Sequence, residues 1–342
     1  MRLTCPAFID LHVHLREPGQ SAKGDIAHET AAAYAGGFGL LLALANTTPA
    51  IDSVPLWEEQ QRRLAAHGAD GVRVIQAACM TLGRAGREPV DAAALAAAGV
   101  TVLSDDGSTP QDTGVVRECA RRAQEADLLM VDHCEDPEST RQGELALVER
   151  DIMLAMETGA RFHLQHLSTA EAVEMLRQAK ADGTPVSGEA TPHHLALDKS
   201  AVARWGTNAK MSPPLREADD RMALLQGVAD GTIEAVATDH APHTAAEKAL
   251  PWAQAPNGII GLEAAFAVAC TELVAGGLMT LEALVARFTT GPAAILRVPV
   301  PDRRITLEYT PEAPAALTTA EWRSKARNCP WEGYRATARI LP

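Results

Sequence analysis

IDLHVHLR, residues 9–16, is the stretch on which the interpretation of the whole sequence depends. It predicts a strand, and alternate residues of an extended strand share a face. We therefore expect His12, His14 and Arg16 to point one way. Two imidazoles on one face can bind a single metal ion. Two residues are a weak motif, however, and an ordinary strand with two polar residues near its end is an equally good interpretation. The apolar residues expected on the opposite face are Leu11, Val13 and Leu15.

Apolar runs of similar length recur along the chain, each followed by a polar turn and a helical pattern. Eight strands that alternate with helices predict an α/β fold, a parallel (β/α)8 barrel of the TIM type. A doubly wound open sheet is the alternative, but no glycine fingerprint follows any strand to support a nucleotide-binding version. The expected strands are Phe8–His14, Leu40–Asn46, Val72–Cys79, Val100–Ser104, Leu128–His133, Arg161–His166, Pro185–Glu189 and Ile233–Asp239. The expected helices between them are Ile26–Ala35, Leu56–His67, Asp91–Ala98, Val115–Glu125, Gly143–Thr158, Ala170–Ala181 and Asp219–Ala229.

The last third of the chain predicts a boundary near Pro299. Helical patterns continue over Gly261–Ala275 and Leu281–Phe288, and then prolines and isolated strand-like pieces take over, such as Arg304–Tyr309 and Tyr334–Leu341. We expect residues 1–298 to form the barrel. Residues 299–342 are expected to form a short irregular C-terminal appendage that packs on it, because this tail cannot make a core alone.

Composition narrows the functional classes. The chain has 342 residues, of which 46% are hydrophobic, so it can bury a substantial core. A net charge of −13 argues against nucleic acid or an anionic membrane as the main partner. The N-terminus does not resemble a signal peptide, and the longest apolar run, Phe38–Ala45, is too short to span a bilayer. Six scattered cysteines without CxxC spacing favour reduced thiols in a cytoplasmic protein.

Polar side chains gather at the predicted strand ends, where barrels of this type place their active sites. A satisfied or solvated polar residue explains any one of them taken singly. It does not explain why histidines and carboxylates end so many strands of a chain with only 11 histidines, so together they predict a metal site. These strand-end residues are His12, His14, Asn46, Asp105, Asp106, Asp132, His133, Glu135, Asp136, His163, His166, Asp239, His240 and His243.

The residue types indicate hydrolytic chemistry. Neutral imidazoles and carboxylates are typical ligands of a zinc-type site that keeps room for water. A carboxylate such as Asp106 could bridge two cations, and Asp239 could both ligate and shuttle a proton. Cys134 alternates away from His133, so we expect a buried core thiol there. Serine-nucleophile chemistry has no support, since the sequence contains no Gly-x-Ser-x-Gly elbow.

Taken together, these motifs resemble the class I dihydroorotases of the amidohydrolase superfamily. They run in family order over most of the chain, which makes the combination far more specific than HxH alone. The matching segments are HVHLREPG (12–19), AGGF (35–38), NTTP (46–49), SDDG (104–107), DHCED (132–136), QHLST (165–169), PPLR (213–216), ATDHAPH (237–243) and GIIGLE (258–263).

The resemblance implies a ligand set and roles. Asp106 would be the bridging carboxylate, where related hydantoinases and allantoinases have a carbamylated lysine; Asp105 is the rival for that role. Asp239 would be the general acid/base. The residues implied around one or two Zn²⁺ ions are His12, His14, Asp106, His133, His166 and Asp239. The residues implied to hold the substrate carboxylate and ring edge are Arg16, Asn46 and His243, with the backbone around Asn257 and Gly258.

The reaction implied is the reversible cyclisation of N-carbamoyl-L-aspartate to L-dihydroorotate with loss of water, a step of pyrimidine biosynthesis. A planar guanidinium can hold a carboxylate with two hydrogen bonds, and Arg16 shares a strand face with two implied ligands. Arg16 is therefore expected to neutralise the α-carboxylate that marks the substrate.

Three features depart from the family. Little sequence precedes the HxH motif, so we expect the C-terminal tail to lack an N-terminal partner and the family's small β-sandwich to be absent or rudimentary. The segment between Asp136 and Arg150 is short, which would open one side of the site. Ser212 stands where many relatives have a substrate-binding asparagine, and serine donates a hydrogen bond with a shorter reach.

These departures keep alternatives open. One is a catalytically weak subunit that supports a partner such as aspartate transcarbamoylase, although a scaffold has no chemical need for a full ligand set. The other is an allantoinase or hydantoinase. Asp106 argues against this alternative, because those enzymes have a lysine at the corresponding position. A homodimer is compatible with either.

Overall fold

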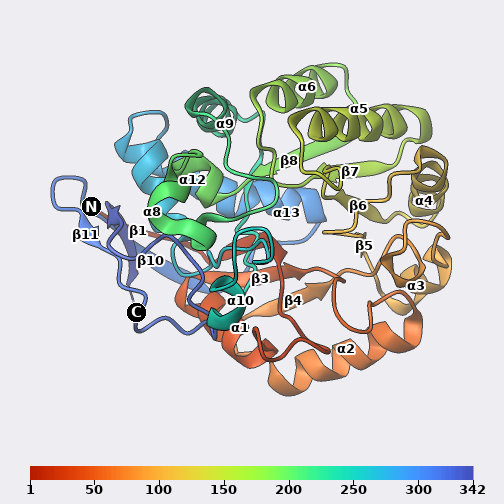
Figure 1. Cartoon of the computed structure of the whole chain (residues 1–342), viewed down its shortest axis with the longest axis horizontal. Coiled ribbons are helices and arrows are strands. Elements are labelled where there is room, and N and C mark those ends of the chain that lie inside the picture. Colours follow the sequence, from red (N-terminus) through yellow and green to blue (C-terminus); the bar gives the residue numbers. More distant parts are fainter. Residues whose placement is uncertain (342) are drawn as a thin grey trace.

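The computed structural model describes residues 1–341, and eight parallel strands in these residues form a closed barrel surrounded by helices (Figure 1). All eight strands expected from the sequence are present, in the expected order. They read as near-continuous apolar runs because a parallel sheet covered by helices is buried on both faces. The barrel strands are β2 (Phe8–Val13), β3 (Phe38–Ala43), β4 (Arg73–Gln76), β5 (Val102–Leu103), β6 (Leu129–Asp132), β7 (Arg161–Leu164), β8 (Val186–Ala190) and β9 (Ala235–Val236).

Two seams close the barrel. Strands β2–β3–β4 form one ladder and β5 to β9 form the other. A parallel bridge between Ala78 and Leu103 joins β4 to β5, and a second between Val13 and His240 joins β9 to β2. At this second seam the His14 amide donates to the His240 carbonyl at 3.0 Å. The closure therefore places the HxH motif beside the residues that follow β9.

The long helices match their expected positions closely. Polar caps set several of their starts: Asp25 accepts a hydrogen bond from the His28 amide before α1, and Thr169 caps α6. The segment expected as one helix over Gly261–Ala275 is instead a short α-helix followed by a π-helix. The bounds are α1 (Ile26–Ala35), α2 (Val54–His67), α3 (Ala92–Ala98), α4 (Thr113–Glu125), α5 (Arg141–Thr158), α6 (Ala170–Ala181), α9 (Ala218–Asp230), α11 (Ala265–Ala269), the π-helix η3 (Cys270–Ala275) and α12 (Leu281–Phe288).

Several short helices have no counterpart in the sequence-based expectation. Each spans seven residues or fewer, so its apolar positions do not complete two helical turns and give no readable period. They are α7 (Pro192–Ala196), α8 (Ala201–Trp205), α10 (Ala245–Lys248) and α13 (Thr290–Leu296), with the 3₁₀ turns η1 (Leu82–Arg84) and η2 (Gly206–Ala209).

The first strand does not alternate as expected. Leu11 packs with Ile9, Leu42 and other strand residues in the cluster that also contacts α13, whereas Val13 and Leu15 belong to the larger cluster under the outer helices. The expectation that these three leucine and valine side chains share one face is therefore wrong. The pairing of β2 with β3 shifts register between Asp10 and Val13, and such a bulge breaks strict alternation. Arg16 lies beyond the end of β2 and has a φ of 64°, so its backbone is not extended.

The expectation that the tail lacks an N-terminal partner is also wrong. Strand β10 (Arg304–Tyr309) pairs antiparallel with β1 (Arg2–Pro6) on one side and β13 (Ala338–Leu341) on the other. The two chain ends consequently meet in one three-stranded sheet at the side of the barrel (Figure 1). A second small ladder joins β11 (Ala315–Ala316) to β12 (Arg335–Ala336). The division into a barrel over 1–298 and an appendage over 299–342 stays a prediction.

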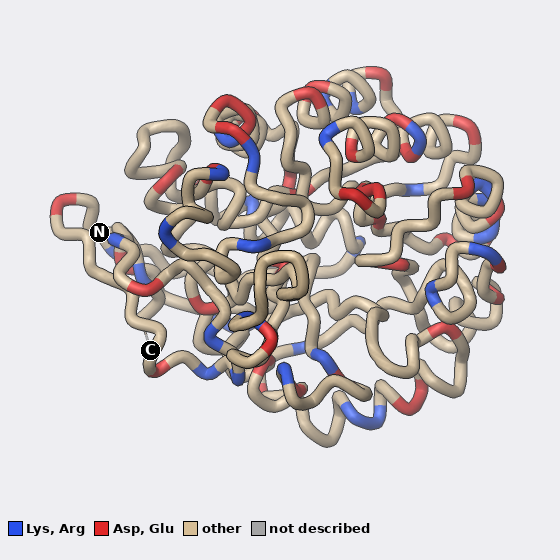
Figure 2. The backbone as a smooth tube through the Cα atoms, in the orientation of Figure 1, with Lys and Arg blue, Asp and Glu red and all other residues tan. Residues whose placement is uncertain are grey.

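Charged residues are mixed over the molecule. Figure 2 shows lysines and arginines interspersed with aspartates and glutamates along the outer helices. In the part of the chain that the structure describes, no helix is both long and apolar enough to cross a membrane.

Candidate active site

Six ionisable side chains converge at the carboxyl ends of the barrel strands, and we call them the histidine cluster. Two of them lie at the end of β2, and the other four follow β5, β6, β7 and β9. All six are buried. Candidate ligand atoms lie within 4.8 Å of one another in three overlapping groups of three residues. The members of the histidine cluster are His12, His14, Asp106, His133, His166 and Asp239.

The two histidines of the HxH motif share the carboxylates. His12 Nε2 lies 3.2 Å from Asp239 Oδ1 and 3.3 Å from Asp106 Oδ1. His14 Nε2 lies 3.0 Å from Asp239 Oδ1. Their outer nitrogens are held by oxygens, since His12 Nδ1 is 2.9 Å from Glu189 Oε1 and His14 Nδ1 is 2.9 Å from Asn46 Oδ1. An oxygen partner on Nδ1 is typical of a histidine whose Nε2 binds a metal, so both Nε2 atoms are oriented for an ion.

The other side of the cluster repeats this arrangement. His133 Nε2 is 2.7 Å from Glu135 Oε2, so its proton sits there and Nδ1 faces inward. His133 Nδ1 lies 3.4 Å from Asp106 Oδ1 and 2.8 Å from His166 Nε2. Inward-facing imidazole nitrogens around shared carboxylates form a donor set that a divalent cation would satisfy. These residues therefore fit a zinc-type ion.

Charge in the cluster favours the same conclusion. Burial opposes protonation of His12, but Asp239 and Asp106 outweigh it and raise its pKa well above the ordinary value. Burial is likewise outweighed at His133, where Asp106 and Glu135 raise the pKa to about 10. The pKa of Asp106 is held well below its usual range, against the effect of burial, by His12 and His133. The carboxylates thus stabilise positive charge at His12 and His133, whereas burial lowers the pKa of His14 and His166.

Glu189 is a functional residue that the sequence analysis missed. Its carboxylate contacts His12, and it also lies 3.0 Å from His163 Nε2 and accepts from the His166 amide at 3.3 Å. Burial would raise its pKa, but hydrogen bonds from His12 and His163 hold it at about 2. The signal was available: Glu189 ends an expected strand, as the named candidates do.

Of the two neighbouring aspartates after β5, only Asp106 joins the histidine cluster. The Asp105 carboxylate accepts from the backbone amides of Met80 at 2.8 Å and Thr81 at 3.2 Å. Burial raises the pKa of Asp105 to about 6 despite these bonds. The geometry favours Asp106 as the candidate bridging ligand.

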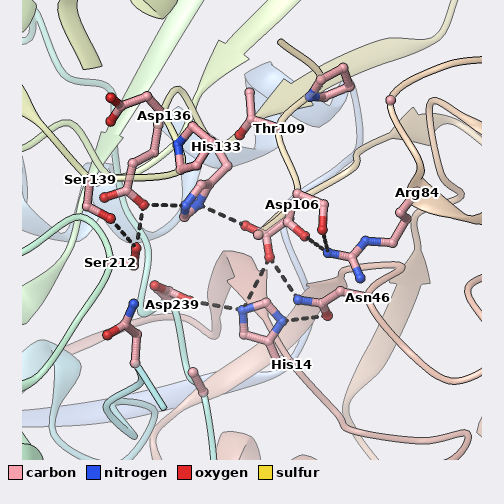
Figure 3. Close-up of a pocket in the computed structure, with 18 of the residues that line it drawn as sticks. His14, Asn46, Arg84, Asp106, Thr109, His133, Asp136, Ser139, Ser212 and Asp239 are labelled. Atoms are coloured by element: carbon pink, nitrogen blue, oxygen red, sulfur yellow. Dashed lines mark hydrogen bonds and ion pairs between the residues drawn. The ribbon is translucent and has the colours of Figure 1, made fainter. Parts of the chain in front are cut away.

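A cavity of about 890 Å³ opens onto the cluster, and all six candidate substrate residues line it. Figure 3 shows His14, Asp106, His133 and Asp239 facing a common space from different strands. His12 and His166 are buried and do not line the cavity. The candidate substrate residues on the walls are Arg16, Asn46, Ser212, His243, Asn257 and Gly258.

Arg16 and His243 form a polar wall beside the cluster. Arg16 Nε donates to the Pro242 carbonyl at 3.1 Å, and its Nη2 lies 3.3 Å from His243 Nε2. Burial lowers the pKa of His243 to about 3, with Arg16 contributing, so the imidazole is neutral at pH 7. Burial lowers the pKa of Arg16 only to about 10, because Asp239 and Asp106 support its charge. The wall therefore carries one positive charge toward the cavity.

Two candidate substrate residues already have protein partners. Asn46 Nδ2 donates to Asp106 Oδ2 at 2.9 Å while its oxygen contacts His14, so its amide ties two cluster members together. Ser212 Oγ donates to Glu135 and lies 3.4 Å from Ser139 Oγ (Figure 3). The sequence analysis named Glu135 among the strand-end residues but gave it no individual role.

A second group of buried ionisable side chains adjoins the histidine cluster, and we call it the arginine cluster. Its members are Asp132, Cys134, Arg150 and Asp151. Arg150 contacts Asp132 Oδ2 at 2.5 Å and Asp151 Oδ1 at 2.8 Å. Cys134 Sγ lies 3.4 Å from Asp151 Oδ2. The expected core position of Cys134 is confirmed, and burial raises the pKa of this thiol well above normal.

Comparison with solved structures establishes the class of fold. L-hydantoinase (dihydropyrimidinase) from Arthrobacter aurescens superposes with a TM-score of 0.90 at 20% identity, covering 99% of this chain and 83% of that one. Dihydropyrimidinase from Brevibacillus agri NCHU1002 gives 0.87 at 19% identity, with the same coverage of both chains. At these identities the likeness concerns the fold alone, which is the barrel of these two solved structures.

Sequence comparison identifies the family. The model of the Dihydro-orotase-like family matches residues 1–149. Dihydroorotase from Anaeromyxobacter dehalogenans is 41% identical, covering 99% of this chain and 84% of that protein. Dihydroorotase from Geobacillus thermodenitrificans is 40% identical, covering 98% and 83%. The chain belongs to the dihydroorotase family, which confirms the resemblance drawn from its motifs.

Proposed function

We propose that the chain is a zinc-dependent enzyme that cyclises N-carbamoyl-L-aspartate to L-dihydroorotate and water, reversibly, in de novo pyrimidine biosynthesis. The observation that carries this proposal is the convergence of the histidine cluster and Arg16 on one cavity. The histidine cluster supplies ligands for a metal that would activate the cyclic amide. The Arg16 guanidinium supplies a positive charge for the carboxylate on the same substrate. Membership of the dihydroorotase family supports the same reaction.

The histidine cluster would hold one or two Zn²⁺ ions. When bound, zinc lowers the pKa of a water ligand and polarises a carbonyl oxygen. Asp239 has the position of a general acid/base, because its Oδ1 lies at the cluster and its side chain also lines the cavity. In hydrolysis its carboxylate would accept a proton from the attacking water and return it to the ring nitrogen as the amide bond breaks.

Arg16 would bind the substrate α-carboxylate. Its guanidinium is fixed by the Pro242 carbonyl and by His243, so little side-chain freedom is lost on binding. Neutral His243 adds no competing charge, and its Nδ1 has no hydrogen-bond partner among residues 1–341. Asn257, the Gly258 backbone and Ser212 also line the cavity, where they would contact the ring.

The alternatives are less well supported. A catalytically weak subunit serving aspartate transcarbamoylase would not need a closed set of oriented histidines. Against an allantoinase or hydantoinase stands Asp106, which contacts His12 and His133 and is our proposed bridging ligand, where the resemblance implies a lysine in those enzymes. A homodimer and a transcarbamoylase complex both stay proposals. Six free, buried cysteines support the proposed cytoplasmic location.

The test is an assay of purified protein for dihydroorotate hydrolysis, with metal analysis on the same sample. We expect turnover with one or two zinc ions per chain, loss of activity after chelation, and recovery when zinc is returned. Bound zinc without turnover, both alone and with aspartate transcarbamoylase, would rule out the enzymatic proposal. Turnover only with the transcarbamoylase would identify a partner-dependent enzyme.

A further inference from the structure

The C-terminal tail reaches the cavity wall through the segment Ser324–Trp331. Trp331 is fully buried, and its Nε1 donates to the Ile260 carbonyl at 3.0 Å. The Ile260 amide in turn donates to the Asn328 carbonyl at 3.1 Å. Apolar contacts with Met211 and Ile259 complete this attachment. The tail is thus docked against the loops that follow β9.

The side-chain amide of Asn328 links two of these loops. Its oxygen accepts from the His243 amide at 3.0 Å. Its nitrogen donates to the Ala241 carbonyl at 2.9 Å and to the Gly258 carbonyl at 3.0 Å. Asn328 is only 3% exposed, so these bonds are shielded from water. One planar group therefore accepts from and donates to the segment Ala241–His243 while it also donates to Gly258.

The linked segments are tightly packed on each other. Gly258 has a φ of 147°, and a Cβ at this position would lie 2.6 Å from His243 Cδ2. The imidazole consequently rests on the Gly258 backbone, while its Nε2 contacts Arg16. A shift of either loop would move His243 and, through it, the guanidinium.

We propose that Asn328 is a positioning residue for the carboxylate-binding wall formed by Arg16 and His243. This inference rests on the proposed function. Asn328 acts through the backbone of Ala241, His243 and Gly258 and does not touch the substrate. The tail is then part of the active-site architecture, because it fixes the two loops relative to each other.

The experiment compares Asn328→Asp and Asn328→Ala with Tyr334→Phe. Asn328→Asp keeps the size and the acceptor but removes the donor, and Asn328→Ala removes both without adding charge. Tyr334→Phe removes another hydrogen bond between tail and barrel, the 2.6 Å contact with Glu272, away from the cavity. We expect the Asn328 variants to raise KM for dihydroorotate by about 10- to 100-fold with kcat reduced less than about threefold. Tyr334→Phe should leave KM within about twofold.

Two further readouts separate positioning from general stability. A protonated carboxyl can donate one hydrogen bond, so the KM of Asn328→Asp relative to wild type should fall as pH decreases. Hydrogen exchange at the His243 amide should accelerate in Asn328→Ala, which removes the acceptor of this amide, and stay unchanged in Tyr334→Phe.

Wild-type KM in both Asn328 variants, with only a lower melting temperature, would overturn the inference. An inactive wild-type protein would instead refute the proposed function. In that case the exchange data decide the inference: unchanged exchange at His243 would overturn it, and accelerated exchange would support it.

Discussion

The histidine cluster and the arginine cluster lie side by side after β6 but balance their charge differently. His133 belongs to the first and the preceding Asp132 to the second, and the Asp132 carboxylate accepts from the His133 amide at 3.0 Å. Both clusters contain three candidate ligands within 4.8 Å. The arginine cluster has its own cation in Arg150, whereas the histidine cluster presents imidazole nitrogens and carboxylates to a cavity.

The difference shows why ligand spacing alone does not define a metal site. In the arginine cluster, burial and the neighbouring Asp151 raise the pKa of Asp132 against the effect of Arg150, and the thiol of Cys134 is also held protonated by burial. A metal ion there would have to displace a guanidinium and two protons. In the histidine cluster the inward imidazole nitrogens face the carboxylates, which favour positive charge at His12. We therefore expect metal in one cluster and structural ion pairing in the other.

The largest expected effect comes from Asp239→Asn in the histidine cluster. The change keeps the shape of the side chain but removes both its charge and its ability to accept a proton, so kcat should fall by about 10⁴-fold. Steady-state kinetics at matched zinc content measures this. Asp91→Asn is the control, since Asp91 is an exposed cap of α3 and asparagine caps equally well. Near-normal turnover in Asp239→Asn would contradict the acid/base role.

A smaller effect is expected from Arg150→Met in the arginine cluster. Removing the cation leaves Asp132 and Asp151 buried without their partner, which should cost about 3–5 kcal/mol of unfolding free energy. Urea denaturation of the zinc-loaded protein measures the loss. Arg117→Met is the matched control, because its pair with Glu157 is solvent-exposed and should contribute less than about 1 kcal/mol. Equal losses in the two variants would show that Arg150 does not neutralise a buried cluster.

The barrel could be predicted from the sequence because its signals are local. Parallel strands buried on both faces read as apolar runs, and helices such as Ile26–Ala35 and Ala170–Ala181 were placed to the residue. Strand β1 was not recognised, since Arg2–Pro6 is short and its partner β10 lies about three hundred residues away in sequence. The bulge in β2 was also not predicted, because a strict period-two pattern assumes a regular strand.

The convergence of the strand-end residues could be predicted, whereas the residues that hold them in place were harder to find. Strand-end position indicated His12, His133 and Asp239, and only the family resemblance favoured Asp106 over Asp105. Glu189 has the same position but was overlooked. Asn328 and Arg150 gave no local signal, because their roles come from tertiary contacts with Gly258 and Asp132.

The smallest effect is expected from Cys134→Ala. This variant tests directly whether metal binding is confined to the histidine cluster. A thiol that binds no metal contributes packing and a weak contact with Asp151, so its removal should cost about 1 kcal/mol of unfolding free energy. Zinc content and kcat should remain at wild-type values. Cobalt substitution adds a spectroscopic check, because a thiolate ligand would produce a sulfur-to-metal charge-transfer band that we expect to be absent from the wild-type protein. Loss of one zinc equivalent in Cys134→Ala, or such a band, would show that the arginine cluster also binds metal.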